Sequence, residues 1–232
     1  MSQRELIGER VGEILENLNK ITPGGGVKLM AVTKYRTRQE ALWAVEAGVH
    51  LIGENRIQEA RQKWGHEAAP VPLHYIGHVQ TNKVKYAIKL FDSVDSVDSE
   101  RVAESLERGL AKVLPVMLEV NIGGEASKFG LEPQAVRPFL ASVGQWPHLQ
   151  VTGLMTVLPA RRDNSFAEIR RIRQEMQEMA DLWRMCRNDG WPWAPLKELS
   201  MGMSGDWEWA VEAGSTMIRL GTQIFGPRPV IA

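Results

Sequence analysis

Residues 27–53 of the 232-residue chain read VKLMAVTKYRTRQEALWAVEAGVHLIG, and this stretch decides the fold class. Residues 27–33 are a short apolar run of strand length, bounded by turn residues and polar positions. Residues 38–47 look helical, and residues 50–53 are again extended. A strand, a helix and a second strand in this order pair the two strands in parallel through a crossover. The stretch therefore predicts one β-α-β unit of a parallel sheet.

The same alternation continues to the end of the chain. The expected strands are residues 27–33, 50–53, 73–77, 90–94, 115–121, 149–157, 199–203 and 216–225. The expected helices between them are residues 38–47, 57–64, 82–88, 99–110, 134–143, 166–186 and 207–213. Eight such units in about 200–250 residues match a (β/α)8 barrel better than an open sheet. No linker-like stretch divides the chain, so we predict an α/β fold, a single TIM barrel domain over residues 1–232, with a doubly wound open sheet as the alternative.

A helix is expected before the first strand. Its apolar positions recur at helical spacing: Ile7, Val11, Ile14, Leu15 and Leu18. The proline and three glycines of residues 23–26 end it. The barrel is therefore predicted to carry a leading N-terminal helix.

The composition excludes several classes of protein. Lysine and arginine together number 28, as do aspartate and glutamate, so there is no basic excess for nucleic acid. A single cysteine, Cys186, excludes an internal disulfide and a thiolate metal cluster. The first residues are too charged for a signal peptide, and no apolar run reaches membrane-spanning length. We therefore expect a globular cytoplasmic protein that binds neither nucleic acid nor membranes.

Polar and glycine residues gather where the expected strands end. They are Lys34, residues 54–56, residues 80–83, Asp95, Ser96, Asn121, Gly123, Gly124, Thr156, Ser204, Gly205 and residues 219–222. Barrel enzymes place their chemistry at these strand ends and in the loops that follow. The ring of polar residues predicts a ligand at the mouth of the barrel.

The loops after the last two expected strands suggest a phosphate site. In this fold a phosphate often binds between these loops, beside a short helix. Ser204 and Gly205 lead into the helix expected at residues 207–213, and their hydroxyl and backbone N–H groups could hold an anion. Gly221 and Thr222 supply a second close turn and a second hydroxyl. The alternative is an ordinary N-cap at Ser204 and an ordinary turn at Gly221.

Lys34 follows the first expected strand and should face the mouth. Dehydration and nearby cations both lower the pKa of a lysine amine and favour its neutral, nucleophilic form. A phosphate site opposite such a lysine suits a cofactor that carries both an aldehyde and a phosphate. The alternative is a solvent-exposed lysine at a strand end. His74 and His78 have metal-ligand spacing, but on a strand they need not converge, and no metal site is predicted.

Several segments together resemble the pyridoxal phosphate homeostasis protein family. They are residues 31–34, 53–59, 74–83, 119–122, 127–130, 153–156, 199–204 and 218–226. The most specific are LSMGMS at residues 199–204 and IRLGTQIFG at residues 218–226. The likeness runs from about residue 28 to the end, in the same order, and chance does not explain a match of that extent.

The resemblance implies a barrel related to the N-terminal half of alanine racemase, with pyridoxal 5′-phosphate (PLP) held as a Schiff base on Lys34. It implies that Asn55 contacts the ring and that Arg219 faces the pyridine nitrogen. The residues implied for phosphate binding are Ser204, Gly205, Gly221 and Thr222. Family members are implicated in PLP supply and amino-acid balance without established turnover, so no catalytic residue is predicted. The implied partners are PLP and the apoenzymes that use it, and the chain is expected to be a monomer or weak dimer.

Arg219 also limits the chemistry. A guanidinium only donates hydrogen bonds, so a pyridine nitrogen facing it stays unprotonated and the ring is a weaker electron sink. The alternative for Arg219 is a salt bridge to a neighbouring strand.

Three functions remain: a PLP carrier or regulator, a racemase-like PLP enzyme, and a scaffold that senses PLP. The racemase relatives use a tyrosine from a second domain. Here residues 226–232 follow the last expected strand, and Tyr35 beside Lys34 should point away from it, so we favour the carrier.

Overall fold

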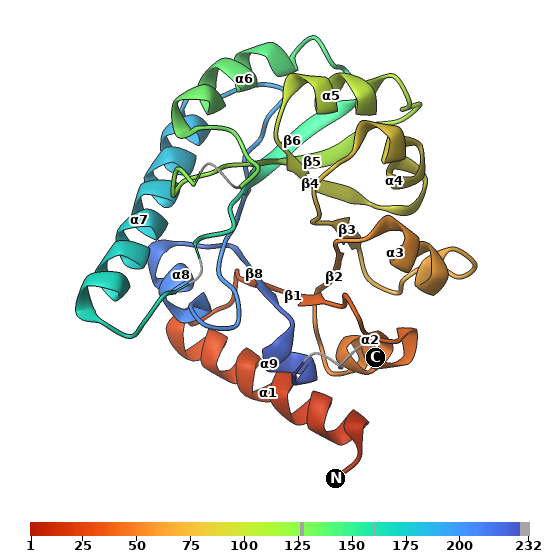
Figure 1. The fold of residues 1–232 in the computed structure, drawn as a ribbon, viewed down its shortest axis with the longest axis vertical. Helices are drawn as coiled ribbons and strands as arrows, with labels where there is room; N and C mark the ends of the chain where they lie inside the picture. The colour runs from red at the N-terminus through yellow and green to blue at the C-terminus, as the bar shows by residue number, and fades with distance from the viewer. Residues whose placement is uncertain (126–127, 160, 228–232) are drawn as a thin grey trace.

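The computed structural model describes residues 1–125, 128–159 and 161–227. Its parallel strands form one closed barrel in chain order, with β8 pairing back onto β1 (Figure 1). The strands are β1 (Lys28–Val32), β2 (Leu51–Glu54), β3 (Leu73–Tyr75), β4 (Ser93–Val97), β5 (Leu114–Glu119), β6 (Leu149–Met155), β7 (Glu198–Ser200) and β8 (Met217–Leu220). The predicted (β/α)8 barrel is therefore confirmed, and the open sheet is wrong.

Helices surround the barrel on the outside (Figure 1). They are α1 (Gln3–Ile21), α2 (Arg38–Glu46), α3 (Ile57–Trp64), α4 (Val84–Leu90), α5 (Glu100–Glu107), α6 (Val136–Val143), α7 (Phe166–Asn188), α8 (Trp207–Ala213) and α9 (Thr222–Phe225). Short 3-10 turns at Thr81–Lys83 and Pro133–Ala135 precede α4 and α6. No helix in the described ranges is long and apolar enough to cross a membrane.

The predicted leading helix is α1. Its start is fixed by a capping box, in which the Ser2 hydroxyl accepts from the Glu5 N–H and the Glu5 carboxylate accepts from the Ser2 N–H. Its buried side chains are Ile7, Val11, Ile14 and Leu18. They share a core cluster with residues of β1, β8 and α9, such as Leu29, Ile218 and Phe225, so α1 covers the outside of the barrel where its first and last strands meet.

The interior of the barrel is filled by a second set of side chains. Met30, Leu51, Met117, Met155 and Met217 form one buried cluster. These residues come from five different strands around the barrel, so they can meet only in its interior. Side chains two residues apart on a strand point to the same face. The residues two positions further on in β5 and β8 therefore lie one layer closer to the mouth.

The structure corrects the position of the fourth strand. The strand expected at residues 90–94 is β4, Ser93–Val97, because Leu90 still belongs to α4. Ser93 and Asp95 are buried and joined by a hydrogen bond of 2.6 Å from Ser93 Oγ to Asp95 Oδ1. Asp95 and Ser96 thus lie within the strand rather than after it. A polar strand whose polar groups satisfy one another does not show the apolar pattern by which a strand is recognised.

The structure also corrects the last expected strand, residues 216–225. β8 ends at Leu220, and Thr222–Phe225 form the short helix α9 after a turn at Gly221. Ile224 and Phe225 are buried in the cluster that includes α1. The apolar pattern of these residues reflects packing against α1, which sequence spacing alone attributes to a strand.

Candidate functional site

Six of the seven predicted site residues line one cavity of about 280 Å³ at the carboxyl ends of β1, β7 and β8. Its lining residues are Val32, Lys34, Arg36, Met203, Ser204, Gly205, Arg219, Gly221 and Thr222. We call it the cradle cavity. Closure of the barrel by β8 against β1 brings Lys34 beside residues that lie about 170 to 190 positions later in the chain. This is the edge of a TIM barrel at which ligands bind.

Lys34 lies two residues beyond the end of β1 and is half-buried. Lys34 belongs to a turn in which the Arg36 N–H donates to the Thr33 carbonyl at 3.0 Å, and it lines the cradle cavity together with Val32. Tyr35 is not extended, contrary to our expectation: its φ of 61° lies in the left-handed region. The Arg56 guanidinium lies 4.7 Å from the centre of the Tyr35 ring.

The loop between β7 and α8 forms a second wall of the cavity. Asp206 Oδ1 accepts from the Met203 N–H at 2.6 Å and closes the loop on itself. Ser204 Oγ accepts from the Gln223 N–H at 3.4 Å and joins this loop to α9. A Cβ built on Gly205 would meet no heavy atom within 4 Å, so the backbone there borders open space. The N-cap of α8 is Asp206, so the alternative of an N-cap at Ser204 is wrong.

Arg219 on β8 is buried and firmly held. Its Nη1 donates to Ser200 Oγ and its Nη2 to the Thr156 carbonyl, both at 2.7 Å. Within the described residues no carboxylate forms an ion pair with it, so the predicted alternative of a salt bridge is not what the structure contains. Burial lowers the pKa of Arg219, while the charges of Asp95 and Glu119 act against that shift. A guanidinium starts high enough to remain protonated.

Glu119, at the end of β5, was not among the predicted site residues. It lies two residues after Met117, which faces the barrel interior, so its carboxyl group faces the same way near the mouth. Burial raises the pKa of Glu119 to about 7, and the like charge of Asp98 adds to the shift, while Arg219 opposes it. The sequence signal was its place in the fifth expected strand, two positions before Asn121 of the predicted ring of polar residues.

Asn55 is the predicted residue that lies elsewhere. It follows β2 and lines a separate hollow of about 230 Å³ with residues of α3 and the β3 end, such as Tyr75 and His78. Its Oδ1 is buried and has no hydrogen-bond partner within the described residues. Gly77 packs so closely on Asn55 that a Cβ there would lie 2.3 Å from the Asn55 carbonyl oxygen. Gly77 thus holds the Asn55 backbone in place, and the buried Asn55 Oδ1 is an unused hydrogen-bond acceptor among the described residues.

The two histidines with metal-ligand spacing have different partners. His74 Nδ1 lies 2.8 Å from Asp95 Oδ2 in the barrel. Burial lowers the pKa of His74, but the charge and hydrogen bond of Asp95, together with the charge of Asp92, raise it above its ordinary value. His78 Nδ1 lies 3.1 Å from Asp98 Oδ2. The His78 ring stacks on Phe129 with centroids 3.6 Å apart. Within the described ranges no group of three or more His, Cys, Asp or Glu side chains could hold a metal ion.

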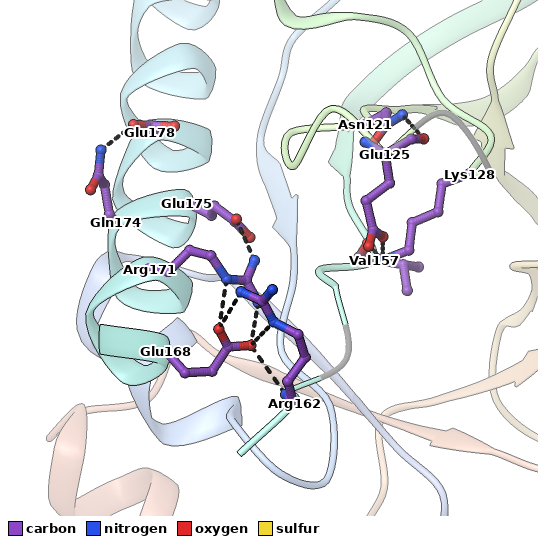
Figure 2. Close-up of polar contacts among 10 residues, drawn as sticks. All are labelled: Asn121, Glu125, Lys128, Val157, Arg162, Glu168, Arg171, Gln174, Glu175 and Glu178. Atoms are coloured by element: carbon purple, nitrogen blue, oxygen red, sulfur yellow. Dashed lines mark hydrogen bonds and ion pairs between the residues drawn. The ribbon is translucent and has the colours of Figure 1, made fainter. Parts of the chain in front are cut away.

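The loops after β5 and β6 are pinned by two polar clusters (Figure 2). Lys128 Nζ lies 2.6 Å from Glu125 Oε2 and 3.4 Å from the Val157 carbonyl, which joins the two loops. Glu168, at the start of α7, is bound by both Arg162 and Arg171, which hold the pKa of that carboxyl well below its usual range. Ser127, which belongs to one of the family-like segments, lies outside the described residues.

The cradle cavity can accommodate a phosphorylated aldehyde. Lys34 provides an amine, Ser204 and Thr222 provide hydroxyls, and Gly205 leaves space for a bulky anion beside the backbone. Arg36 and Met203 also line the cavity, and the sequence analysis missed both. Arg36 could have been found from its spacing of two residues from Lys34. The orphaned Oδ1 of Asn55 fits a further polar contact from the neighbouring hollow.

The closed α/β barrel, the lysine after β1 and the polar cavity at β7 and β8 together are features of alanine racemase-like barrels. Residues 11–229 match the sequence model of the alanine racemase N-terminal domain. The solved alanine racemase of Corynebacterium glutamicum, 18% identical, superposes with a TM-score of 0.74 over 99% of this chain and 62% of its own, and so shares the fold.

Closer relatives identify the family. The pyridoxal phosphate homeostasis protein of Aquifex aeolicus is 32% identical over 95% of this chain and 97% of its own. PipY of Synechococcus elongatus, solved without PLP, is 33% identical with a TM-score of 0.83 over 95% of this chain and 100% of its own. The same protein with PLP bound is 32% identical, with a TM-score of 0.78 over 93% of this chain and 100% of its own. The chain belongs to the pyridoxal phosphate homeostasis protein family.

Proposed function

We propose that this protein binds PLP in the cradle cavity, holds it as a Schiff base on Lys34 and takes part in intracellular PLP homeostasis. The observation that carries the proposal is that Lys34, Ser204, Gly205, Arg219, Gly221 and Thr222 line one cavity. The PLP bound to PipY, 32% identical over most of the chain, supports it. We further propose that the protein works in the cytoplasm, as a monomer or weak dimer, and exchanges PLP with apoenzymes that require it.

Each of the seven predicted site residues has a role in this proposal. The Lys34 amine binds the aldehyde carbon, and Ser204, Gly205, Gly221 and Thr222 bind the phosphate. Arg219 faces the pyridine nitrogen, with its guanidinium oriented by Ser200 and the Thr156 carbonyl. Asn55 contacts the ring from the side of β2. PLP, when bound, supplies an electrophilic aldehyde and an electron-withdrawing ring.

Arg219 argues for holding PLP rather than turning over amino acids. A donor-only partner leaves the pyridine nitrogen unprotonated, whereas a carboxylate partner favours the protonated ring that stabilises a carbanion. The hydrogen bonds to Ser200 and Thr156 fix the position of the Arg219 guanidinium and offset part of the cost of burying its charge. We therefore propose slow or absent turnover.

A visible spectrum of the purified protein tests the proposal. The protein should be yellow after purification or after addition of PLP, and borohydride should bleach the band. Mass mapping should then locate the reduced pyridoxyl group on the peptide that contains Lys34. A colourless protein that takes up no PLP would contradict the proposal.

The second candidate is an amino-acid racemase, favoured by the fold shared with alanine racemase. Racemisation needs one group to remove the α-proton and another, on the opposite face, to return it. Exchange of the α-proton of L-alanine into D2O measures this activity. Turnover near 1 s⁻¹, roughly the low end for enzymes, that disappears in Lys34→Ala would favour the racemase over the carrier.

A further inference from the structure

A buried ion cluster lies directly behind the segment that carries Lys34. Lys63 Nζ lies 2.9 Å from Glu54 Oε1 and 2.8 Å from Glu59 Oε1. Glu54 is the last residue of β2, and Glu59 and Lys63 lie one turn apart on α3. The side chains of Glu54 and Lys63 are 0% and 8% exposed, and that of Glu59 is 20% exposed. We call these three residues the α3 clamp.

The α3 clamp binds the peptide groups on both sides of Lys34. Lys63 Nζ donates to the Thr33 carbonyl at 2.5 Å, and the Tyr35 N–H donates to Glu59 Oε1 at 2.6 Å. The Thr33 carbonyl belongs to the peptide group before the Lys34 Cα, and the Tyr35 N–H to the one after it. Fixing both peptide planes fixes φ and ψ of Lys34, and with them the direction of its Cα–Cβ bond.

The third contact of the α3 clamp anchors the end of β1. Thr33 Oγ1 donates to Glu54 Oε1 at 2.6 Å, and both residues are fully buried. Burial raises the pKa of Glu54, while the charge of Lys63 and the Thr33 hydroxyl act against that shift. Lys63 and Thr33 thus both favour the ionised form of Glu54, and Glu54 Oε1 accepts hydrogen bonds from both.

Tyr35 shows that the backbone after Lys34 is under constraint. Its φ of 61° is in the left-handed region, which few residues other than glycine adopt. Such a conformation persists only where surrounding contacts determine it. The bond from the Tyr35 N–H to Glu59 is a contact of that kind, on the amide of the constrained residue itself.

We propose that Glu54, Glu59 and Lys63 are positioning residues that hold the Lys34 amine toward the cradle cavity. None of the three lines that cavity, so they act through the backbone of residues 33–35. This inference rests on the proposed function of Lys34. It also gives the segment GENRIQE at residues 53–59 a physical meaning. Asn55 lines a hollow at the mouth of the barrel, while Glu54 and Glu59 bind the residues on either side of Lys34.

Two substitutions at Glu59 and one matched control test the α3 clamp. Glu59→Ala removes the acceptor for the Tyr35 N–H, and Glu59→Gln keeps an oxygen that can accept it. Glu107 is the control, because its side chain is 17% exposed and accepts from the His148 backbone N–H at 3.1 Å. It also binds the His148 ring, but at the opposite, amino-terminal end of β6. Glu107→Ala therefore removes a similar contact far from Lys34.

The readouts are PLP affinity from the visible band, hydrogen exchange of the Tyr35 amide, and the melting temperature. In Glu59→Ala we expect PLP to bind about tenfold more weakly or worse, and the Tyr35 amide to exchange faster. Glu59→Gln should recover most of the affinity. Glu107→Ala should lower the melting temperature while leaving PLP affinity and Tyr35 exchange unchanged.

The outcomes separate the inference from the proposed function. A reduced label that maps away from Lys34 in the unmodified protein refutes the proposed function, and the inference falls with it. A label on Lys34 with unchanged affinity in Glu59→Ala overturns the α3 clamp alone. Equal weakening by Glu59→Ala and Glu107→Ala also overturns it, because the effect would then follow overall stability.

Discussion

The two sides of the barrel mouth differ in how their polar groups are used. The side at β7, β8 and β1 holds the cradle cavity of about 280 Å³, where Arg219 is bound by Ser200 and Thr156. The side from β3 to β5 holds a larger hollow of about 740 Å³, which we call the outer hollow. Its residues are His78, Val79, Gln80, Thr81, Asn82, Asp98, Ser99, Arg101, Val102, Lys128, Phe129 and Gly130.

If cavity volume alone decided the binding site, the ligand would bind in the outer hollow and not in the cradle cavity that we propose. The largest pocket of a protein is the usual first hypothesis for its binding site. In the outer hollow, His78 Nδ1 lies 3.1 Å from Asp98 Oδ2, and Lys128 is paired with Glu125. In the cradle cavity, Arg219 is oriented by two neutral partners, Ser200 and the Thr156 carbonyl. Our proposal therefore selects the site by the side chains that line it and not by its volume.

The largest expected effect is the loss of covalent PLP in Lys34→Ala. The variant should lose the Schiff-base band completely and keep its far-UV circular dichroism, because a half-buried side chain at a cavity supports little packing. Lys83→Ala and Lys128→Ala, on the other side of the mouth, should keep the band and the reduced label. A label that persists in Lys34→Ala and maps to Lys83 or Lys128 would reverse the comparison.

The next effect concerns the phosphate. Hydrogen bonds to a charged group are worth roughly 1.5–3 kcal/mol each, so pyridoxal, which lacks the phosphate, should bind at least about a hundredfold more weakly than PLP. Thr222→Val should reduce this ratio, whereas Thr81→Val in the outer hollow should leave it unchanged. Titration of the visible band with both aldehydes measures the ratio. Similar affinities for the two aldehydes would count against a phosphate cradle.

A smaller effect, on stability, is expected from Arg219→Met. The change removes the donors to Ser200 and Thr156 and a positive charge that interacts with the charges of Asp95 and Glu119. Loss of hydrogen bonds from a charged donor to two buried acceptors costs about 3 kcal/mol of unfolding free energy. Arg137→Met is the control, because Arg137 is 52% exposed and solvent screens its pair with Asp189. If urea unfolding showed the same loss of free energy in both variants, the buried hydrogen bonds of Arg219 would contribute no more to stability than an exposed ion pair.

The sequence predicted the barrel and the cradle side of its mouth well. Both depend on features that are local in sequence: apolar runs separated by helical periods, and glycine or hydroxyl residues at strand ends. Lys34, Ser204, Gly221 and Arg219 could be named because a closed barrel fixes where its strand ends meet. β4 was misplaced because Ser93 and Asp95 bond to each other inside the barrel.

The hollow beside Asn55 and the contacts that hold the backbone around Lys34 could not be predicted from local sequence features. Nothing in the spacing indicates that Asn55 opens into a different hollow from Lys34, since this depends on side-chain packing around β2 and β3. The contact of Lys63 with Thr33 joins residues 30 positions apart through a tertiary fold. The raised pKa of Glu119 is a consequence of burial, which the residue type does not reveal.

The smallest predicted effect is a pH dependence that comes from Glu119, on the β5 side of the mouth. Because the folded pKa of about 7 lies above the ordinary value of 4.5, the native state favours the protonated carboxyl. The stability that this group contributes is fully present below about pH 4.5 and is lost as the pH rises through about 7. In the PLP-free protein, Glu119→Gln should therefore match the unmodified protein near pH 4. At pH 8 it should be more stable by about 1–3 kcal/mol, less than the full shift implies because Glu119 is only partly buried.

Urea unfolding of the two proteins at several pH values measures this difference directly, since the contributions of other groups cancel. Glu16→Gln provides a control of opposite sign, because hydrogen bonding to Lys20 lowers the pKa of Glu16. A carboxyl with a lowered pKa contributes stability above its unfolded pKa, so this variant should be slightly less stable at pH 8. If Glu119→Gln showed no gain between pH 4 and pH 8, the pKa of Glu119 would be the same in the native and unfolded states, and Glu119 would be ionised at neutral pH. The β5 side would then carry a permanent negative charge opposite Arg219, and the two sides of the mouth would be coupled rather than independent.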